Sequence, residues 1–317
     1  MARTFDFLIN AEVIVDDVAV AERVFVDALG FPTQKPSWGS TEPGFGFTFL
    51  FARVHPSMTV SPTRIEAMAL STIDPAIDSD RLITFLPDIL AAQGDRPWKT
   101  HANEIASSEI DTVEAELRRR GCAVHAMPRG PRVPFSRLWL GWDDKPAAYH
   151  ADVDGGLFLE VVEMGPHMVR LPEFWDTVAD PDLPPGSLIR VSRRSWLVGD
   201  LDATLRTLRS NLAWEPTVSP EIDDERGVRR AVFTFKHPRS AELELLEPIR
   251  PGDAKESLET WGPGSWAIRI SVNDLDAKAD DLRRRGTPFE PLTETTGPIL
   301  RVDTGPLGAA GLFEFTA

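Results

Sequence analysis

The feature that most constrains the fold of this 317-residue chain is an internal repeat. Residues 15–31 and 198–214 both read as a strand ending in Asp, a helix, and an exit made of Leu, a small residue and an aromatic. The spacing from that Asp to that Leu is the same in both copies. Residues 109–121 and 274–286 form a second pair, and both copies contain the run Leu-Arg-Arg-Arg-Gly. Such self-similarity indicates a duplicated supersecondary unit.

The second pair also shows why these segments should be helical. Acidic residues stand at the start of each segment and three arginines at its end, so both ends complement the helix dipole. Gly121 and Gly286 follow directly, as a left-handed C-cap requires. Ile110, Val113 and Leu117 form one apolar stripe at helical spacing. We therefore predict a helix in each copy.

One strand precedes each predicted helix and strand-like runs follow it, which indicates modules of the form βαβββ. The runs after the helices are 45–51 and 64–70; 137–142, 147–151 and 157–162; 230–236 and 242–246; and 299–303 and 312–315. Asp154-Gly155 is a hairpin-turn signal between two of these runs. Residues 81–92 are predicted to form a connecting helix, interrupted by Pro87.

The four modules span residues 5–72, 98–165, 186–248 and 264–317. They group into a first domain, 1–165, and a second domain, 186–317. Five prolines between them, in residues 166–185, indicate a linker.

Composition excludes several classes of protein. A net charge of −15 disfavours nucleic-acid binding, because a phosphate backbone would be repelled. The single cysteine, Cys122, excludes an intramolecular disulfide and a cysteine-cluster metal site. No apolar run is long enough to span a membrane and the N-terminus lacks the features of a signal peptide, so we expect a cytoplasmic protein without membrane contact. Nucleophile, phosphate-loop and dinucleotide motifs are also missing.

Two segments carry a resemblance to a known family. Residues 149–160 resemble the final hairpin of the vicinal-oxygen-chelate superfamily, an aromatic followed by Asp-Pro-Asp-Gly and a strand carrying Glu, with Val153 in place of the proline. Residues 17–31 resemble the superfamily's first helix, which ends in Leu-Gly-Phe. The superfamily includes glyoxalases, bleomycin-resistance proteins and extradiol dioxygenases. The resemblance covers nearly the whole chain and is specific for fold more than for reaction.

The resemblance implies an α+β fold in which paired βαβββ modules form two half-open β-barrels. In metal-dependent members, the first and last strands of each module supply the metal ligands. The first-strand positions, usually His or Gln, hold Asn10, Ala102, Arg193 and Ala267 in this chain. The last-strand positions, usually Glu, hold Glu66, Glu160, Glu244 and Glu314.

The second domain therefore lacks half of the ligand pattern. Arg193 stays protonated and cannot be a ligand, and Ala267 has no donor atom. We expect Glu244 to pair with Arg193 there. This also disfavours an extradiol dioxygenase, since those members use two His and one Glu in the second domain.

The first domain keeps two alternatives open. His101 lies one position before Ala102, on the face that strand alternation turns away unless a bulge restores it. Glu12 and Glu104 lie two residues beyond the usual ligand positions, and with Asn10 they are predicted to line a substrate cavity. A buried cluster of acids needs a cation, shared protons or water. The predicted cofactor is one divalent ion, held by His101, Glu66 and Glu160, or none.

Two further side chains are predicted near Glu160. A two-residue turn at Asp154-Gly155 would place Tyr149, the only tyrosine, opposite Glu160, where both could act in catalysis. Trp139 is a candidate for stacking on a flat or cationic ligand, and core filling is its alternative role.

Two functions remain compatible with the sequence. One is a metal-assisted lyase, isomerase or oxygenase acting on a small organic molecule. The other is a metal-free protein that binds a drug or metabolite, similar to the resistance members. The predicted partner is a small-molecule ligand in either case, and the chain is compatible with a monomer or a homodimer.

Overall fold

The computed structural model describes residues 3–32, 45–74, 83–131, 133–143, 148–165, 172–176, 178–309 and 311–317. Parts of the predicted linker, residues 166–171 and 177, lie outside them, as do residues 81–82 of the predicted connecting helix and residue 147 of a predicted strand. None of the described helices is both long and apolar enough to cross a membrane.

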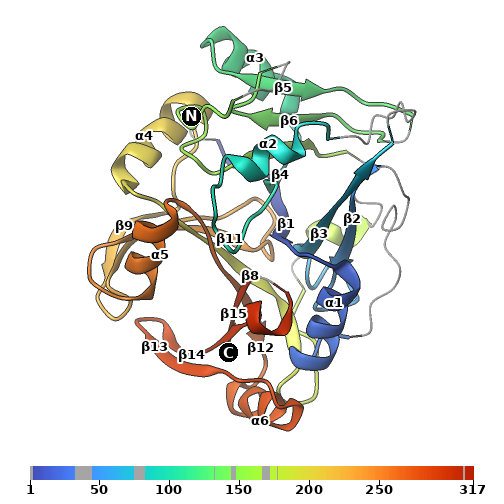
Figure 1. Cartoon of the computed structure of the whole chain (residues 1–317), viewed down its shortest axis with the longest axis vertical. Helices are drawn as coiled ribbons and strands as arrows, with labels where there is room; N and C mark the ends of the chain where they lie inside the picture. The colour runs from blue at the N-terminus through green and yellow to red at the C-terminus, as the bar shows by residue number, and fades with distance from the viewer. Residues whose placement is uncertain are drawn as a thin grey trace.

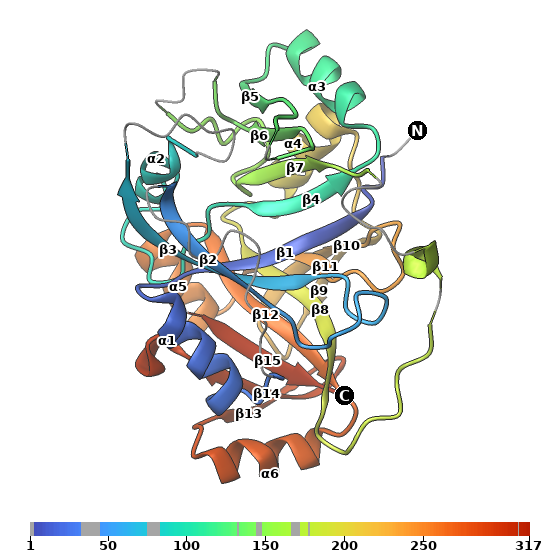
Figure 2. The ribbon, with the colours of Figure 1, turned by 90° about the vertical axis from the view of Figure 1, so that its right-hand side faces the viewer.

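The first half of the chain forms one curled, seven-stranded sheet (Figure 2). Each module pairs its first strand in parallel with its last, β1 with β3 and β4 with β7. The modules join where the two first strands meet antiparallel, β1 against β4. In sheet order the strands are β2 (Phe45–Ala52), β3 (Arg64–Ile73), β1 (Phe7–Ile14), β4 (Asn103–Ser107), β7 (Leu159–Glu163), β6 (Arg137–Leu140) and β5 (Val124–Met127).

The second half repeats this arrangement in an eight-stranded sheet. The first strands β8 and β12 again meet antiparallel, and each pairs in parallel with the last strand of its module, β11 and β15. The order is β13 (Glu290–Glu294), β14 (Gly297–Asp303), β15 (Leu312–Thr316), β12 (Gly264–Val272), β8 (Leu188–Leu197), β11 (Glu242–Pro248), β10 (Val228–Phe233) and β9 (Val218–Asp223). The predicted α+β fold with two half-open barrels is confirmed.

Each module carries its helix between the first strand and the remaining strands. Asp17, Asp200 and Asp274 cap three of these helices by accepting hydrogen bonds from backbone N–H groups of the first turn. Gly121 and Gly286 follow the C-terminal ends of the helices in the second and fourth modules, at φ +75° and +71°, as predicted. The helices are α1 (Val18–Arg23) with a π-helical continuation η1 (Val24–Ala28), α2 (Leu86–Ala91), α3 (Ile110–Arg119), η2 (Pro172–Trp175, 3-10), α4 (Leu201–Leu212), α5 (Asp253–Trp261), α6 (Leu275–Arg285) and η3 (Gly305–Leu307, 3-10).

The module helices pack crosswise between the two halves (Figures 1 and 2). Helix α3 lies beside α4, and η1 lies beside α6. Lys278 on α6 donates to the carbonyl of Leu29 at 2.7 Å, and Asn211 at the end of α4 donates to the carbonyl of Asp152 at 2.9 Å. One hydrophobic core contains buried residues of both halves, so the two sheets are held together by shared packing.

Trp214 is a central contact in this shared core. It is 1% exposed and meets Phe5 edge-to-face, with ring centroids 5.0 Å apart, and Phe233 at 4.5 Å. Phe5 belongs to the first half of the chain and Trp214 and Phe233 to the second. Residue 3 also forms an isolated parallel bridge with Trp214.

Several local predictions were wrong. Asp154-Gly155 does not join two paired strands, since residues 151–155 form turns and β6 ends at Leu140. The predicted strand 147–151 is turn and coil over its described part. The connecting helix begins at Leu86 and not at residue 81, with Pro87 in its first turn.

Strands β5, β9 and β13 and helix α5 were not predicted. β9 and β13 are mostly exposed edge strands that contain proline, so they lack an alternating apolar pattern.

Replacing Trp214 should destabilise the whole protein. We expect Trp214→Ala to lower the free energy of unfolding by about 3–5 kcal/mol, because it leaves a cavity between the halves. Ile222→Ala, at a side chain 59% exposed, is the control and should cost less than about 0.5 kcal/mol. Urea unfolding followed by circular dichroism measures both; equal losses would contradict this account of the interface.

Candidate functional site

A row of polar side chains crosses one face of the first sheet. Residues directly opposite each other on neighbouring strands point to the same face. The pairing runs from Arg64 to Asn10, Glu104, Glu160 and Trp139. Two residues along, Glu12 lies opposite Glu66. The alternate residues Ala11, Ile65, Ile105 and Val161 point the other way and belong to the shared core.

Glu12 anchors the segment that enters β4. Its carboxylate accepts hydrogen bonds from the backbone N–H of His101 at 3.1 Å and of Ala102 at 3.2 Å, and from the Thr100 hydroxyl at 3.1 Å. It also pairs with Nδ1 of His101. This turns Nε2 of His101 toward Glu160 Oε2, 3.2 Å away, and Glu104 Oε1, 3.7 Å away.

Asn10 links the remaining two acids. Its amide nitrogen donates to Glu66 Oε2 at 2.9 Å and to Glu104 Oε2 at 2.5 Å. Its carbonyl oxygen accepts from Nε of Arg64 at 3.0 Å. Arg64 lies over the ring of Phe51, with Cζ 3.8 Å from the centroid. The amide therefore holds two carboxyl groups and one guanidinium in fixed positions.

The cluster holds more carboxyl groups than the cations within it can neutralise. Glu12, Glu66 and Glu160 are at most 3% exposed, and the Glu104 side chain is 14% exposed. Burial and the neighbouring carboxylates raise the pKa of Glu66 well above its usual range, and burial and Glu160 raise that of Glu104 to about 7. Burial alone would lower the pKa of His101, but Glu12 and Glu160 raise it well above its ordinary value.

Three of these side chains offer a metal-binding arrangement. One ligand atom each from His101, Glu104 and Glu160 lies within 4.8 Å of the others. One imidazole nitrogen and carboxylate oxygens suit a divalent ion such as Mn²⁺, Mg²⁺ or Zn²⁺. The contact of Nδ1 with Glu12 leaves Nε2 as the ligand atom, as in many carboxylate–histidine–metal sites. The surplus of buried negative charge also fits a cation. The donor set therefore fits the metal that the fold family implies.

Several site residues have other neighbours in the structure than the sequence predicted. His101 reaches the cluster because β4 begins at Asn103, so strand alternation does not govern its direction. Glu104 takes the place beside His101 and Glu160 that we had predicted for Glu66, which contacts Asn10 instead. Thr100 and Arg64 were not predicted. Arg64 was detectable, because it precedes Glu66 by two residues and so shares its face.

The predicted pairing of Tyr149 with Glu160 is wrong, because Trp139 lies opposite Glu160. Tyr149 instead donates from its hydroxyl to Asp154 at 2.5 Å and accepts from the backbone N–H of Phe158 at 3.1 Å. Trp139 is 1% exposed, lies edge-to-face on Phe85 at 5.5 Å, and its indole N–H has no hydrogen-bond partner among the described residues.

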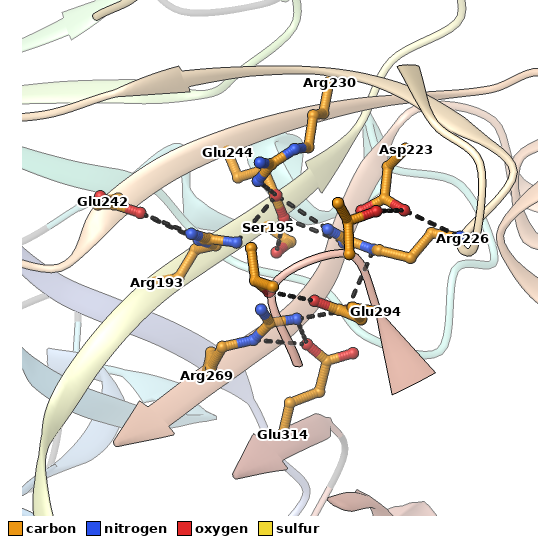
Figure 3. Close-up of polar contacts among 12 residues, drawn as sticks. Arg193, Ser195, Asp223, Arg226, Arg230, Glu242, Glu244, Arg269, Glu294 and Glu314 are labelled. Atoms are coloured by element: carbon orange, nitrogen blue, oxygen red, sulfur yellow. Dashed lines mark hydrogen bonds and ion pairs between the residues drawn. The ribbon is translucent and has the colours of Figure 1, made fainter. Parts of the chain in front are cut away.

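The second sheet carries guanidinium groups at the equivalent positions (Figure 3). Its row runs from Glu242 to Arg193, Arg269, Glu314 and Arg301. Arg193 therefore stands where the first sheet has Asn10, and Arg269 where it has Glu104. Arg193 Nη1 lies 3.1 Å from Glu244 Oε1, which confirms the predicted pair.

Residues outside this row take part in neutralising the charged side chains of the second sheet. Arg226, in the turn between β9 and β10, donates to both oxygens of Glu244 at 2.9 and 3.0 Å (Figure 3). Glu294, at the end of β13, accepts from Arg269 at 2.6 Å. Burial alone would raise the pKa of Glu244 and Glu314, but the arginines around them hold both below the usual range. These glutamates are bound to the protein's own cations.

The chain is similar over nearly its whole length to a protein of known structure. No protein-family model and no curated protein matches it. A solved structure of a mutant 4-hydroxymandelate synthase from Streptomyces coelicolor matches with a TM-score of 0.55 and 13% identity, over 99% of this chain and 92% of that one. The chain has the two-domain vicinal-oxygen-chelate fold.

Two further solved structures are similar to part of the chain. Methylmalonyl-CoA epimerase from Streptomyces coelicolor is 28% identical over 41% of this chain and 99% of its own, with a TM-score of 0.35. The epimerase from Mycobacterium tuberculosis is 26% identical over 39% and 85%, also at 0.35.

The ion pairs of the second sheet predict a dependence of stability on pH. A carboxyl whose pKa is lower in the folded state stabilises the protein above its unfolded pKa, and this is lost as the pH falls. Wild type should therefore exceed Glu314→Gln in free energy of unfolding by about 3 kcal/mol at neutral pH. The difference should shrink below the ordinary glutamate value of 4.5. Urea titrations over a pH series measure this, and a constant difference would contradict it.

Proposed function

We propose that the first half-barrel is a metal-assisted acid–base site that moves a proton on a small organic substrate, as a lyase or isomerase does. The observation that carries this proposal is the orientation of His101. Glu12 holds its Nδ1, while its Nε2 faces Glu104 and Glu160. Nε2 and one oxygen each of Glu104 and Glu160 thus lie close enough together to coordinate a single ion.

His101, Glu104 and Glu160 would hold the ion, and Glu12 would fix the imidazole from behind. A divalent ion bound there supplies Lewis-acid stabilisation of an oxyanion on the substrate. Glu104 is the most exposed of the three ligand side chains, at 14% against 2–3% for the others. The substrate would therefore approach from the side of Glu104.

Glu66 is the group best suited to exchange a proton with the substrate. Burial and the neighbouring carboxylates raise its pKa above that of an ordinary glutamate, which favours a carboxyl that exchanges a proton with a bound substrate. Asn10 fixes its Oε2 at 2.9 Å. Trp139 stands beside Glu160, and its indole N–H, which has no hydrogen-bond partner among the described residues, would donate to a substrate oxygen. Tyr149 is held by Asp154 and Phe158, so we give it no step in the proton transfer.

A metal-free binding protein is the second candidate. Asn10 and Ala102 occupy the positions where metal-dependent members usually have His or Gln. The raised pKa values of Glu66 and Glu104 allow protons to neutralise the cluster in place of an ion. In this case the same face would bind a small organic ligand without turnover.

Metal binding separates the two candidates. We expect the purified protein, dialysed against Mn²⁺, to retain about one ion per chain by elemental analysis, as a three-ligand site predicts. Glu160→Gln and His101→Ala should each reduce affinity at least about tenfold. Glu314→Gln is the matched control, because it changes the equivalent last-strand glutamate of the second sheet and should leave the stoichiometry unchanged. Wild-type protein that retains no Mn²⁺, Mg²⁺ or Zn²⁺ would favour the binding protein.

Proton exchange tests the chemistry without a known substrate. In D₂O, the Mn²⁺- or Mg²⁺-loaded protein should catalyse loss of the α-proton signal from some members of a panel of α-hydroxy ketones and acyl thioesters, measured by NMR after removal of the protein. Glu66→Gln should slow this exchange by about 10²–10⁴-fold while retaining the metal. An exchange rate unaffected by Glu66→Gln would exclude Glu66 as the acid–base group.

A further inference from the structure

A pocket lies beside α5 in the second half of the chain, and none of its described lining residues belongs to the candidate metal site. Its volume is about 590 Å³, within the usual range for small-molecule sites. Helix α5 forms one wall, and residues of β13, β14 and η3 form the others. Trp98, from the first half of the chain, completes the lining.

Aromatic rings make up much of this pocket. Trp98 and Trp266 meet at 6.1 Å between ring centroids, and Trp261 at the end of α5 is 37% exposed. Phe289 lines the other side. The guanidinium of Arg301 already lies over the ring of Trp266, with Cζ 5.6 Å from the centroid. The pocket therefore contains a cation–π contact of its own, and the exposed indole of Trp261 has no such contact with the described residues.

The charge around these rings is negative. Asp253, Glu256, Glu290 and Asp303 line the pocket, and Arg301 is the only cationic side chain among the described residues that line it. Arg301 is itself neutralised, because Nη2 lies 3.0 Å from Glu314 and Nη1 3.6 Å from Asp253. Within the described part of the chain, Glu256 and Glu290 form no ion pair. An anionic ligand would meet uncompensated carboxylates here, and a cationic ligand would be attracted.

One buried polar group also lacks a partner. Ser257, on α5, lines the pocket, is 3% exposed, and its hydroxyl has no hydrogen bond within the described residues. A buried hydroxyl without a hydrogen-bond partner is unfavourable. A ligand with a donor or acceptor group could satisfy it.

We propose that this pocket binds an organic cation with a flat, aromatic body. The indoles of Trp98, Trp261 and Trp266 would contact the rings, Glu256 and Glu290 would neutralise the charge, and Ser257 would hydrogen-bond to a polar edge. The site is separate from the acids of the first sheet, so it does not depend on the proposed metal-assisted reaction.

Three tricyclic probes of the same shape test this proposal. At neutral to slightly alkaline pH, 9-aminoacridine is a cation, acridine is neutral and acridine-9-carboxylate is an anion. By isothermal titration calorimetry we expect 9-aminoacridine to bind at a single site, about tenfold more tightly than acridine. Added salt should weaken its binding, and the carboxylate should show none. Failure of 9-aminoacridine to bind, or equal binding of the carboxylate, would overturn the proposal.

Variants locate the binding in the pocket. Glu256→Gln and Trp261→Ala should each raise the Kd of 9-aminoacridine about three- to fivefold, through loss of charge and of cation–π contact. Glu259→Gln is the matched control, because Glu259 lies on the same helix, is exposed, and faces Lys255 outside the lining. Glu160→Gln should also leave the Kd unchanged, which separates this site from the candidate metal site. Binding that neither Glu256→Gln nor Trp261→Ala weakens would place the probe elsewhere and refute the proposal.

Discussion

The antiparallel contact between first strands is the interaction on which both halves of the molecule depend. In the first half β1 meets β4, and in the second β8 meets β12. Each first strand also pairs in parallel with the last strand of its own module, so the first and last strands of both modules become neighbours. Four strands that are distant in sequence thereby present their side chains on one face of each sheet.

The two sheets differ in how the buried carboxyl groups on these faces are neutralised. Both carry two last-strand glutamates, and a buried carboxylate must find a cation or a proton. In the second sheet Arg193 and Arg269 supply the charge, and Arg226 and Arg301 add to it. In the first sheet Asn10 and Glu104 stand at the positions of Arg193 and Arg269, so the acids outnumber the cations within their cluster. These two positions account for the difference, because the second face pairs its carboxylates with arginines and the first face has more carboxyl groups than cations.

The second half also has a pocket of its own. Its charged network is carried by the central strands β15, β12, β8 and β11, and α5 contributes to the lining of the aromatic pocket. Trp98 lines that pocket and His101, three residues later, faces the acids of the first sheet. A single short segment thus contacts both candidate sites, and Arg96 on the same segment donates to the carbonyl of Ser265 in the second half at 2.9 Å.

The sequence by itself determined the repeat, the four module helices, most strands and the four last-strand glutamates, because these follow from local periodicity and end signals. It also showed that Arg193 could pair with Glu244. Only the tertiary structure decided that His101 faces the cluster, because Glu12 on another strand binds the backbone N–H groups of residues 101 and 102. It likewise decided that Trp139 and not Tyr149 lies opposite Glu160, since the register depends on a connection much longer than a tight turn. Contacts such as Arg226 with Glu244 come from a turn whose direction no local pattern specifies, and they determine which carboxylates remain without a cation.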